Sequence, residues 1–586
     1  MNPLQGIATT ESFTLDAEYI QGGQGLWLLT RWRTANSIYT NSTALLILPP
    51  FAEEMNCCRR VFAQLACQLA DAGIDCFLPD FYGTGDSEGD FRAISLQQWQ
   101  QDMLGFLPHL TGYRQVHLLG CRFGAALVLD WLPAMSQIVP TGQILLWQPQ
   151  LDANRFWQQL QRLQQFGESG GHTDSGAETL YVAGYDIPRQ LQAEAVALNS
   201  QLPADVSQIH WFESTLTGQL SPASLKLQQK HPGLQMQALR GQPYWLSQEP
   251  VETQDLLDAT VAVLTASGAK YSLTHGVNSV SAAIATHVQA NIPVNINAPQ
   301  IIPLRLSGKQ SLGIYHAAAS DVLIVMVNGG AQTKAGSHRL QQQLAWHWQQ
   351  AGFASLRFDF PGFGDAEGEP GDFINHARYL TELPAELALV FGKPRRLVLF
   401  GLCDGATAAL LASPMLQPEA VLLLNPWCRL QQNHARTMLK FYYLRRVLSK
   451  EFWQKLLKGQ LNVKASVAAL RRFWQAGTNT TNSSAPDART EVVLAQLSPD
   501  QAVQQAIHNW RQLVLAQQPT PLHLTLSGAD LTAAECAELL KSAGLQQIWQ
   551  QTERLEIPGA NHTLSGEGHC ALLIQASVTF LQKLPR

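Results

Sequence analysis

The sequence has little charge for its length. Only 15% of its 586 residues are Asp, Glu, Lys or Arg, whereas an average soluble domain has about 25%. Hydrophobic residues make up 46% of the chain, which excludes a disordered or fibrous protein and allows large cores. The formal net charge is −5, so we expect no nucleic-acid partner bound over the whole surface.

Paired cysteines and long apolar runs are also lacking. The nine cysteines include no Cys-x-x-Cys pair and no zinc spacing, so we expect free thiols in a reducing compartment and neither a metal nor another cofactor. The sequence has no run of about 18 or more apolar residues, so we expect no segment that spans a membrane. Its first residues lack the basic and then apolar order of a signal peptide. These features predict a cytoplasmic protein.

An internal repeat is present. At an offset of 279 residues, 45–91 resembles 324–370, and both carry the motif Asp-Phe-x-Gly-x-Gly-Asp-x-Glu-Gly, which aligns Asp80 with Asp359. The motif lacks the Gly-x-Gly-x-x-Gly spacing of a dinucleotide site, so we interpret it as a structural loop. The repeat predicts two diverged copies of one domain.

Each copy alternates apolar strands with helices after an extended, antiparallel opening. This pattern predicts an α/β fold in which two tandem, doubly wound sheets are covered by helices on both faces, each with an inserted helical lid. We expect domains at 1–265 and 301–586, joined by a linker at 266–300. The second lid is expected at about 427–518, and the two halves are expected to pack as a pseudo-dimer.

A reactive candidate follows the third parallel strand of the second copy. The turn reads Gly401-Leu402-Cys403-Asp404-Gly405, the Gly-x-nucleophile-x-Gly pattern between a strand and a helix. A side chain in this turn lies at the carboxyl edge of the sheet, where the N–H groups of the next helix favour a thiolate or an oxyanion. Cys403 is therefore a candidate nucleophile; the alternative is a small buried cysteine.

Candidates for the base and its orienting acid follow in the expected order. Asp530 comes after the strand at 521–527, and His562 comes after the strand at 554–557. Asp530 would hold the imidazole, and His562 would take the thiol proton. The alternatives are a helix-capping aspartate and a surface-loop histidine.

An oxyanion hole needs two backbone N–H donors. We expect one from Asp404 and the other from Gly330, with Ala331 as the alternative, because they lie in a Gly-Gly loop after the first parallel strand. A plain turn at the strand end would explain the same loop.

The first copy lacks this chemistry. Its turn reads Gly120-Cys121-Arg122-Phe123-Gly124, and Tyr244 aligns with His562. A guanidinium is not a nucleophile at physiological pH, so we expect a degenerate site. Arg122 either binds a carboxylate or phosphate or pairs with a local acid.

The expected lid of the second copy is strongly basic. Residues 429–472 contain eleven Lys or Arg and a single acid, with aromatic residues between them. We expect Arg445, Arg446 and Trp453 to bind an acidic carrier protein, a coenzyme A or phosphopantetheine phosphate, or an anionic membrane surface. The alternative is a solvated helix face.

These motifs resemble a known pair of families. Residues 43–260, with PPFAEEMN and LLGCRFGA, resemble exosortase A system-associated hydrolase 2, and residues 301–580, with NGGAQTKAGSHR, FGLCDGA and LNPWCR, resemble the companion hydrolase 1. Both belong to the α/β-hydrolase superfamily. The resemblance implies a bacterial protein with α/β-hydrolase domains that is linked to exopolysaccharide and exosortase gene clusters. Those clusters also encode an acyl-ligase-like enzyme and a carrier protein.

The sequence thus predicts an acyl hydrolase or acyltransferase in the second half. Cys403 would attack an ester or thioester, and the donor would be an acyl-bearing small molecule or an acyl or aminoacyl group linked to a carrier protein or to coenzyme A. Two other readings stay open: a non-catalytic binding or scaffold protein, and a dienelactone-hydrolase-like enzyme that acts on a small lactone.

Overall fold

The computed structural model describes residues 12–35, 43–166, 179–268, 298–330, 332–392, 395–429, 494–542 and 544–584. The chain divides into two compact units. Unit 1 comprises Met1–Ala317, Ala331–Gln343 and Arg357–Pro370, and unit 2 comprises Ala318–Gly330, Leu344–Leu356 and Gly371–Arg586. Residues 301–317, which the sequence places in the second domain, thus cluster with unit 1.

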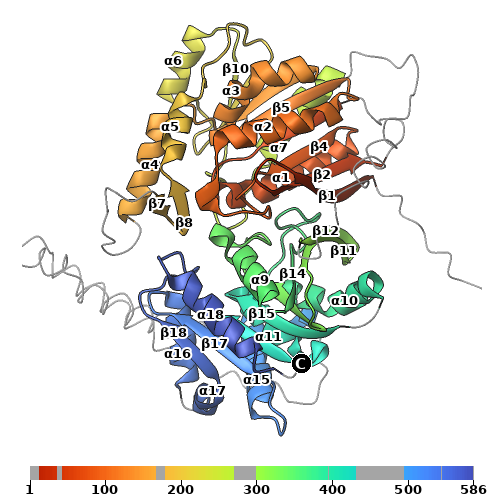
Figure 1. Cartoon of the computed structure of the whole chain (residues 1–586), viewed down its shortest axis with the longest axis vertical. Coiled ribbons are helices and arrows are strands. Elements are labelled where there is room, and N and C mark those ends of the chain that lie inside the picture. Colours follow the sequence, from red (N-terminus) through yellow and green to blue (C-terminus); the bar gives the residue numbers. More distant parts are fainter. Residues whose placement is uncertain are drawn as a thin grey trace, which may run out of the picture. The chain divides into compact units, whose positions relative to one another are not determined.

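Two eight-stranded sheets have equivalent strand orders (Figure 1), β1-β2-β4-β3-β5-β6-β9-β10 and β11-β12-β14-β13-β15-β16-β17-β18. The strands of the first are β1 (Phe13–Gln21), β2 (Leu26–Thr34), β3 (Thr43–Leu48), β4 (Asp75–Asp80), β5 (Gln115–Cys121), β6 (Thr141–Trp147), β9 (Ile209–Thr215) and β10 (Gln235–Arg240). Those of the second are β11 (Gln300–Leu306), β12 (Lys309–His316), β13 (Val322–Val327), β14 (Ala354–Phe358), β15 (Arg396–Leu402), β16 (Ala420–Leu424), β17 (Leu522–Ser527) and β18 (Glu553–Ile557).

Each sheet starts with the antiparallel pair that the sequence predicts, and its later strands pair in parallel. The α/β fold class is therefore confirmed. The repeated motifs lie on equivalent elements of the two sheets, and descent from one duplicated domain stays a prediction.

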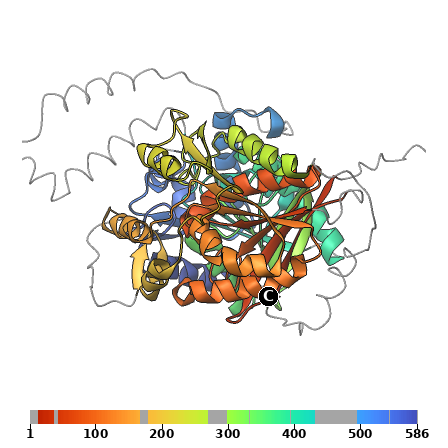
Figure 2. The ribbon, with the colours of Figure 1, turned by 90° about the horizontal axis from the view of Figure 1, so that it is seen from above.

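Helices cover both faces of the first sheet because its strands are apolar on both sides (Figure 2). Leu46 and Leu48 belong to the core under α2 (Leu96–Phe106) and α3 (Phe123–Ile138). Leu45 and Ile47 belong to the core under α1 (Glu53–Asp71) and α7 (Gln254–Gly268). Alternate residues of one strand thus supply two separate cores.

The segment between β6 and β9 of unit 1 mixes helices with a hairpin. It contains α4 (Ala153–Phe166), β7 (Thr179–Val182), β8 (Tyr185–Pro188) and α5 (Gln190–Ala197), and β7 pairs with β8 in antiparallel fashion. The sequence predicts an inserted helical lid at this place, whereas the described part of the segment contains a β-hairpin as well as helices. A further helix, α6 (Pro222–Lys230), connects β9 to β10.

In unit 2, α11 (Asp404–Leu416) lies between α10 (Phe373–Phe391) and α15 (Pro499–Leu515). Asn509 of α15 donates to the carbonyl of Leu410 (3.0 Å), and Trp510 is fully buried. Residues 499–515, the end of the expected lid, therefore form a helix that packs against α11. The rest of that lid, from 430 to 493, lies outside the described residues.

Trp348 of α9 (Leu340–Gln350) stacks edge-on against Phe400 of β15. It also donates to Ser577 of α18 (His569–Leu581) at 2.9 Å. Two shorter helices, α16 (Leu531–Leu540) and α17 (Gln546–Gln551), separate β17 from β18.

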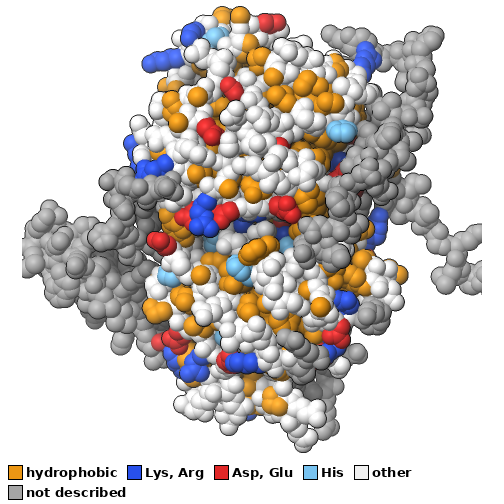
Figure 3. Space-filling view, viewed as in Figure 1, with side chains coloured by type: hydrophobic (Ala, Val, Ile, Leu, Met, Phe, Trp, Pro, Cys, Tyr) orange, Lys and Arg blue, Asp and Glu red, His pale blue; other side chains and the backbone are white. Residues whose placement is uncertain are grey.

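Of the helices that the structure describes, none is both long and apolar enough to cross a membrane. Hydrophobic, charged and uncharged side chains are interspersed on the face that Figure 3 shows.

Unit 1 contains a buried set of charges, here named the charge cluster: Arg59, Asp80, Asp86, Lys334, Arg357, Asp359 and Asp365. It is built on the two repeated Asp motifs. In each loop the first Asp accepts from the backbone N–H of the second, over 2.9 Å for Asp80 and 3.1 Å for Asp359. No side chain of the charge cluster is more than 4% exposed, so the loops enclose ions that must pair with one another.

The buried His376 of α10 predicts a pH-dependent stability. It is 1% exposed, and burial lowers its pKa to about 3. Between about pH 6.5 and about pH 3 the unfolded chain therefore binds a proton that the folded chain does not. This one group should lower the free energy of unfolding by up to about 1.4 kcal/mol per pH unit as the pH decreases through this window.

The variant His376→Leu should have a smaller pH slope in urea unfolding curves recorded across that window, because it removes this proton. His508→Leu, at an exposed position of α15, should keep the slope of the unchanged protein. An unchanged slope in His376→Leu would contradict the assignment.

Candidate active site

The sequence-predicted residues gather at one edge of the second sheet. Cys403 follows β15, Asp530 follows β17 and His562 follows β18. The strands β13, β15, β16, β17 and β18 run parallel, so the loops after them lie at a common carboxyl edge. Gly330, after β13, belongs to the same edge.

Cys403 sits in a strained turn between β15 and α11. Its φ of 57° and ψ of −124° are unfavourable for a residue with a side chain. A Cβ at Gly401 would lie 2.5 Å from Cα of Ala406, and one at Gly405 would lie 2.5 Å from the carbonyl oxygen of Val327. Both glycines are therefore required by close backbone approach, as the sequence pattern predicts.

The backbone of Cys403 is tied on both sides to the end of β16. Its N–H donates to the carbonyl of Leu424 (2.9 Å), and its carbonyl accepts from the N–H of Trp427 (3.0 Å). Its side chain is partly exposed. The thiol is thus presented by a fixed turn at the N-terminus of a helix, where the helix dipole stabilises negative charge.

His562 and Asp530 are hydrogen-bonded to each other. Nδ1 of His562 lies 2.9 Å from Oδ2 of Asp530, and the two side chains are 34% and 10% exposed. With the carboxylate accepting from Nδ1–H, Nε2 carries the lone pair that can accept a proton. The same Oδ2 accepts from the N–H of Ala533 (2.9 Å), so Asp530 is also the cap of α16.

Asn425 is a site residue that sequence reasoning did not identify. Its side-chain amide donates to the carbonyl of His562 (2.8 Å) and to Oγ of Ser527 (2.9 Å), and its Oδ1 accepts from the N–H of Ser527 (2.8 Å). It is fully buried with a φ of 48°, which asparagine tolerates well. Asn425 therefore holds the histidine loop against the strand end that also holds Cys403.

The Asp404 carboxylate occupies part of the expected oxyanion hole. Its Oδ1 accepts from the N–H of Gly330 (2.7 Å) and from the N–H of Gly405 (3.0 Å). The N–H that the sequence assigned to a substrate oxygen is thus directed at a side chain of the turn itself. Ala331, the alternative donor, lies outside the described residues.

Unit 1 has an equivalent turn with different chemistry. Arg122 has a φ of 54° and a ψ of −119°, its N–H donates to the carbonyl of Trp147 (2.9 Å), and its carbonyl accepts from the N–H of Gln150 (3.0 Å). Gln148 has the role of Asn425, because its Oε1 accepts from the N–H of Ser214 (2.8 Å). The scaffold of the turn is therefore the same in both halves.

A bidentate ion pair engages the Arg122 guanidinium. Nε and Nη2 lie 3.1 Å and 3.0 Å from the two carboxylate oxygens of Glu54, and the guanidinium stacks 5.0 Å from the ring of Trp245. Of the two readings of Arg122, the structure shows the pairing with a local acid. Its side chain is 11% exposed, and that of Glu54 is 17% exposed.

The other positions of this first site are filled by packing. Tyr244 is buried, and its hydroxyl lies 3.7 Å from Sγ of Cys121. Phe123, at the position of Asp404, packs edge-on against Phe51, with ring centroids 5.9 Å apart. Aromatic rings therefore replace the carboxylate and the Gly-Gly loop of the second site.

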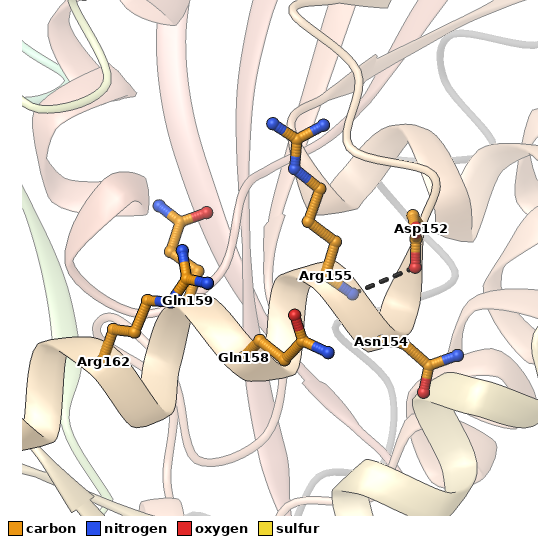
Figure 4. A pocket seen from close by; sticks show the side chains of 6 residues that line it. All are labelled: Asp152, Asn154, Arg155, Gln158, Gln159 and Arg162. Atoms are coloured by element: carbon orange, nitrogen blue, oxygen red, sulfur yellow. Dashed lines mark hydrogen bonds between the residues drawn. The ribbon is translucent and has the colours of Figure 1, made fainter.

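A separate polar pocket of about 440 Å³ lies on α4 (Figure 4). Arg155, Gln159 and Arg162 extend from one side of the helix, and Asp152 accepts from the N–H of Arg155 (3.0 Å). Gln159 also accepts from the amide of Gln150 (3.0 Å), a residue bonded to the Arg122 turn. The partner-binding candidates Arg445, Arg446 and Trp453 lie outside the described residues. In the described part of the chain, no three or more His, Cys, Asp or Glu side chains are placed so that they could hold a metal ion.

Solved structures of esterases and hydrolases resemble parts of the chain. The Pyrococcus furiosus esterase Pf2001 is 13% identical, with 50% of this chain and 94% of the esterase covered at a TM-score of 0.33. The dienelactone hydrolase of Anabaena variabilis is 14% identical, with 49% and 99% covered at a TM-score of 0.31. Est1E of Butyrivibrio proteoclasticus, solved with ferulic acid, is 14% identical, with 48% and 98% covered at a TM-score of 0.30.

No curated protein matches the sequence. A model of the alpha/beta hydrolase family matches residues 324–577, a range that begins in β13 and ends in α18. This part of the chain is therefore similar to domains of the alpha/beta hydrolase family, and the matched range includes Cys403, Asp530 and His562.

Proposed function

We propose that the second half of the chain is a cysteine-dependent acyl hydrolase or acyltransferase. The observation that carries the proposal is the strained turn of Cys403 at the N-terminus of α11, on the same sheet edge as the hydrogen-bonded pair of His562 and Asp530. In this arrangement Cys403 is the nucleophile, His562 is the base, and Asp530 is the acid that orients the base.

In the proposed reaction His562 Nε2 accepts the thiol proton of Cys403, and the sulfur attacks the carbonyl carbon of an ester or thioester. The backbone N–H of Asp404, together with that of Gly330 once freed, stabilises the oxyanion. Collapse breaks the bond to the alcohol or thiol leaving group, which takes the proton from His562. Water or another acceptor then attacks the acyl-thioester and restores the free thiol.

The finer predictions belong to this proposal. The donor is an acyl or aminoacyl group on a carrier protein or on coenzyme A, bound by the basic segment at 429–472, in an exopolysaccharide pathway associated with an exosortase. Catalysis is confined to the second half, because in the first half Arg122 is paired with Glu54 and Tyr244 is buried beside Cys121. The protein is cytoplasmic, and the halves derive from one duplicated domain.

Intact-mass analysis after exposure to acyl-thioester donors tests the proposal. We expect an acyl adduct on Cys403 that forms much faster than on the other eight cysteines and is absent from Cys403→Ala. Cys121 is a matched control, because it lies next to the equivalent turn and is buried. Labelling that is equal among the cysteines, or absent from Cys403, would refute the proposal.

The two alternatives make different predictions. A scaffold protein keeps its full biological function in Cys403→Ala and Cys403→Ser. A lactone hydrolase prefers small cyclic esters over acyl-thioesters in a panel of carbonyl substrates.

Replacing Asn425 by alanine should slow the acylation of Cys403 at least tenfold. The change removes one hydrogen bond to the carbonyl of His562 and two to Ser527 at the end of β17, and burying unpaired polar groups costs about 1–3 kcal/mol each. Acylation is measured by intact mass. Gln148→Ala removes the equivalent contact in unit 1 and should leave the acylation rate unchanged. Equal effects of both variants would contradict the positioning role of Asn425.

A further inference from the structure

The Asp404 side chain accepts a hydrogen bond from an N–H group that the proposed reaction needs for the oxyanion. Its Oδ1 lies 2.7 Å from the N of Gly330 and 3.0 Å from the N of Gly405. The bond to Gly405 is local to the first turn of α11. The bond to Gly330 joins residues 74 positions apart, and it directs the carboxylate into the loop after β13. The carboxylate thus lies where the oxygen of a reacting acyl group would accept the same hydrogen bond.

The surrounding backbone is shaped to this arrangement. A Cβ at Gly329 would lie 2.3 Å from the carbonyl oxygen of Leu402, 2.5 Å from Oδ1 of Asp404 and 3.2 Å from Cβ of Cys403. The close approach of the turn backbone thus already requires a glycine at 329, and the same glycine leaves room for the carboxylate beside the nucleophile. In unit 1 the positions of Gly330 and Asp404 hold Phe51 and Phe123, which contact each other instead.

A carboxylate here opposes the oxyanion that forms during acyl transfer, because like charges at close range repel. For Gly330 to serve the oxyanion, the Asp404 carboxylate must leave its N–H. An ammonium group on the substrate, close to the reacting carbonyl, would give the carboxylate a new partner and turn its charge into an attraction.

We propose that Asp404 determines substrate specificity by selecting acyl groups that carry a positively charged amine on the carbon next to the carbonyl, so that the substrates are aminoacyl esters or thioesters. This inference rests on the proposed function, since it specifies the substrate of the same site. An α-ammonium group lies within two bonds of the reacting carbonyl carbon and can meet a carboxylate seated at the oxyanion position. Neutral acyl groups leave the carboxylate on Gly330, and anionic ones are repelled.

The experiment uses three thioesters of nearly equal shape on one leaving group, N-acetylcysteamine. Alanyl carries an ammonium, isobutanoyl a methyl group and methylmalonyl a carboxylate at the same position. The rate of adduct formation on Cys403 of the full chain is followed by intact mass. We expect the unchanged protein to react with the alanyl donor at least tenfold faster than with the isobutanoyl donor, and slowest with the methylmalonyl donor.

Asp404→Asn separates charge from structure, because its amide oxygen can still accept from the N–H of Gly330. It should lose the preference for alanyl and react faster with isobutanoyl than the unchanged protein does. Asp372→Asn is the matched control, since Asp372 also accepts from N–H groups at a helix start, of Ile374 and Asn375 (both 3.0 Å), and it should keep the preference.

The outcomes are distinguishable. Adducts on Cys403 with equal rates for alanyl and isobutanoyl, or a preference that persists in Asp404→Asn, would overturn the role of Asp404 and leave the proposed function standing. Absence of any adduct on Cys403, in the unchanged protein and in Asp404→Asn, would refute the proposed function and this inference with it.

Discussion

Replacing His562 by alanine should slow the acylation of Cys403 by about 10²–10⁴-fold, the range typical for the loss of a general base. The imidazole is the group that the site offers to accept the thiol proton, and its Nδ1 is held by Asp530 at 2.9 Å. Single-turnover rates with an acyl-thioester, read by intact mass, measure the effect. The loss should be smaller at higher pH, where solvent deprotonates the thiol without the imidazole.

Asp530 needs a more careful variant, because its Oδ2 serves His562 and also caps α16. Asp530→Ser keeps a side-chain acceptor for the helix and removes the carboxylate from the imidazole. It should lower the acylation rate by about 10²-fold or more while the free energy of unfolding changes by about 1 kcal/mol or less. Asp530→Ala should lower both.

Asp372→Ala removes a helix cap of α10 that has no contact with His562 in the described hydrogen bonds. It should therefore lower stability without lowering the acylation rate. If His562→Ala and Asp530→Ser kept the full rate, the pair would be structural, and another base would have to serve Cys403.

The sheet, the turn of Cys403 and the pairing of Asp530 with His562 could be predicted because their signals are local. Apolar strands are recognised by composition, and the glycines of the turn at 401–405 lie within five residues of each other. The order of strands in such a sheet then places loops distant in sequence at one edge. Prediction worked where spacing or topology alone determines position.

The contacts of Asp404 and Asn425 could not be predicted in this way. Whether an aspartate beside a nucleophile points to solvent or to the N–H of Gly330 depends on side-chain packing across 74 residues. Asn425 had a weak signal, a polar residue directly after an apolar strand, but the same signal marks many turns. The two readings of Asp530 illustrate the limit, because the structure shows it capping a helix and bonding His562 at once.

The burial of the carboxylates in the two Asp motifs could not be predicted from the sequence either. The sequence indicated loops, but not that their carboxylates are buried, because the neutralising cations come from other elements. Arg59 is in α1, Arg357 is in β14, and Lys334 lies before α9. Arg357 and Lys334 hold the pKa of Asp86 far below its usual range although burial alone would raise it.

Lys334 is the centre of the charge cluster. Its Nζ lies 2.9 Å from Asp359, 2.5 Å from Asp365 and 3.3 Å from Asp86, and its side chain is 1% exposed. Replacement by methionine keeps the length of the side chain and removes its charge. The four buried carboxylates of the charge cluster then share only Arg59 and Arg357, and breaking a buried pair by removing one partner costs about 3–5 kcal/mol.

We therefore expect Lys334→Met to lower the free energy of unfolding by about 3–5 kcal/mol in chemical denaturation. Lys309→Met is the control: Lys309 pairs with Glu367 at 2.7 Å but is 48% exposed, so its loss should cost about 1 kcal/mol or less. The double variant Lys334→Met with Asp365→Asn should be more stable than the sum of the two single changes by about 1–3 kcal/mol, because it removes one charge of each sign. Strict additivity, or a cost in Lys334→Met no larger than in Lys309→Met, would show that the buried charges are neutralised in another way.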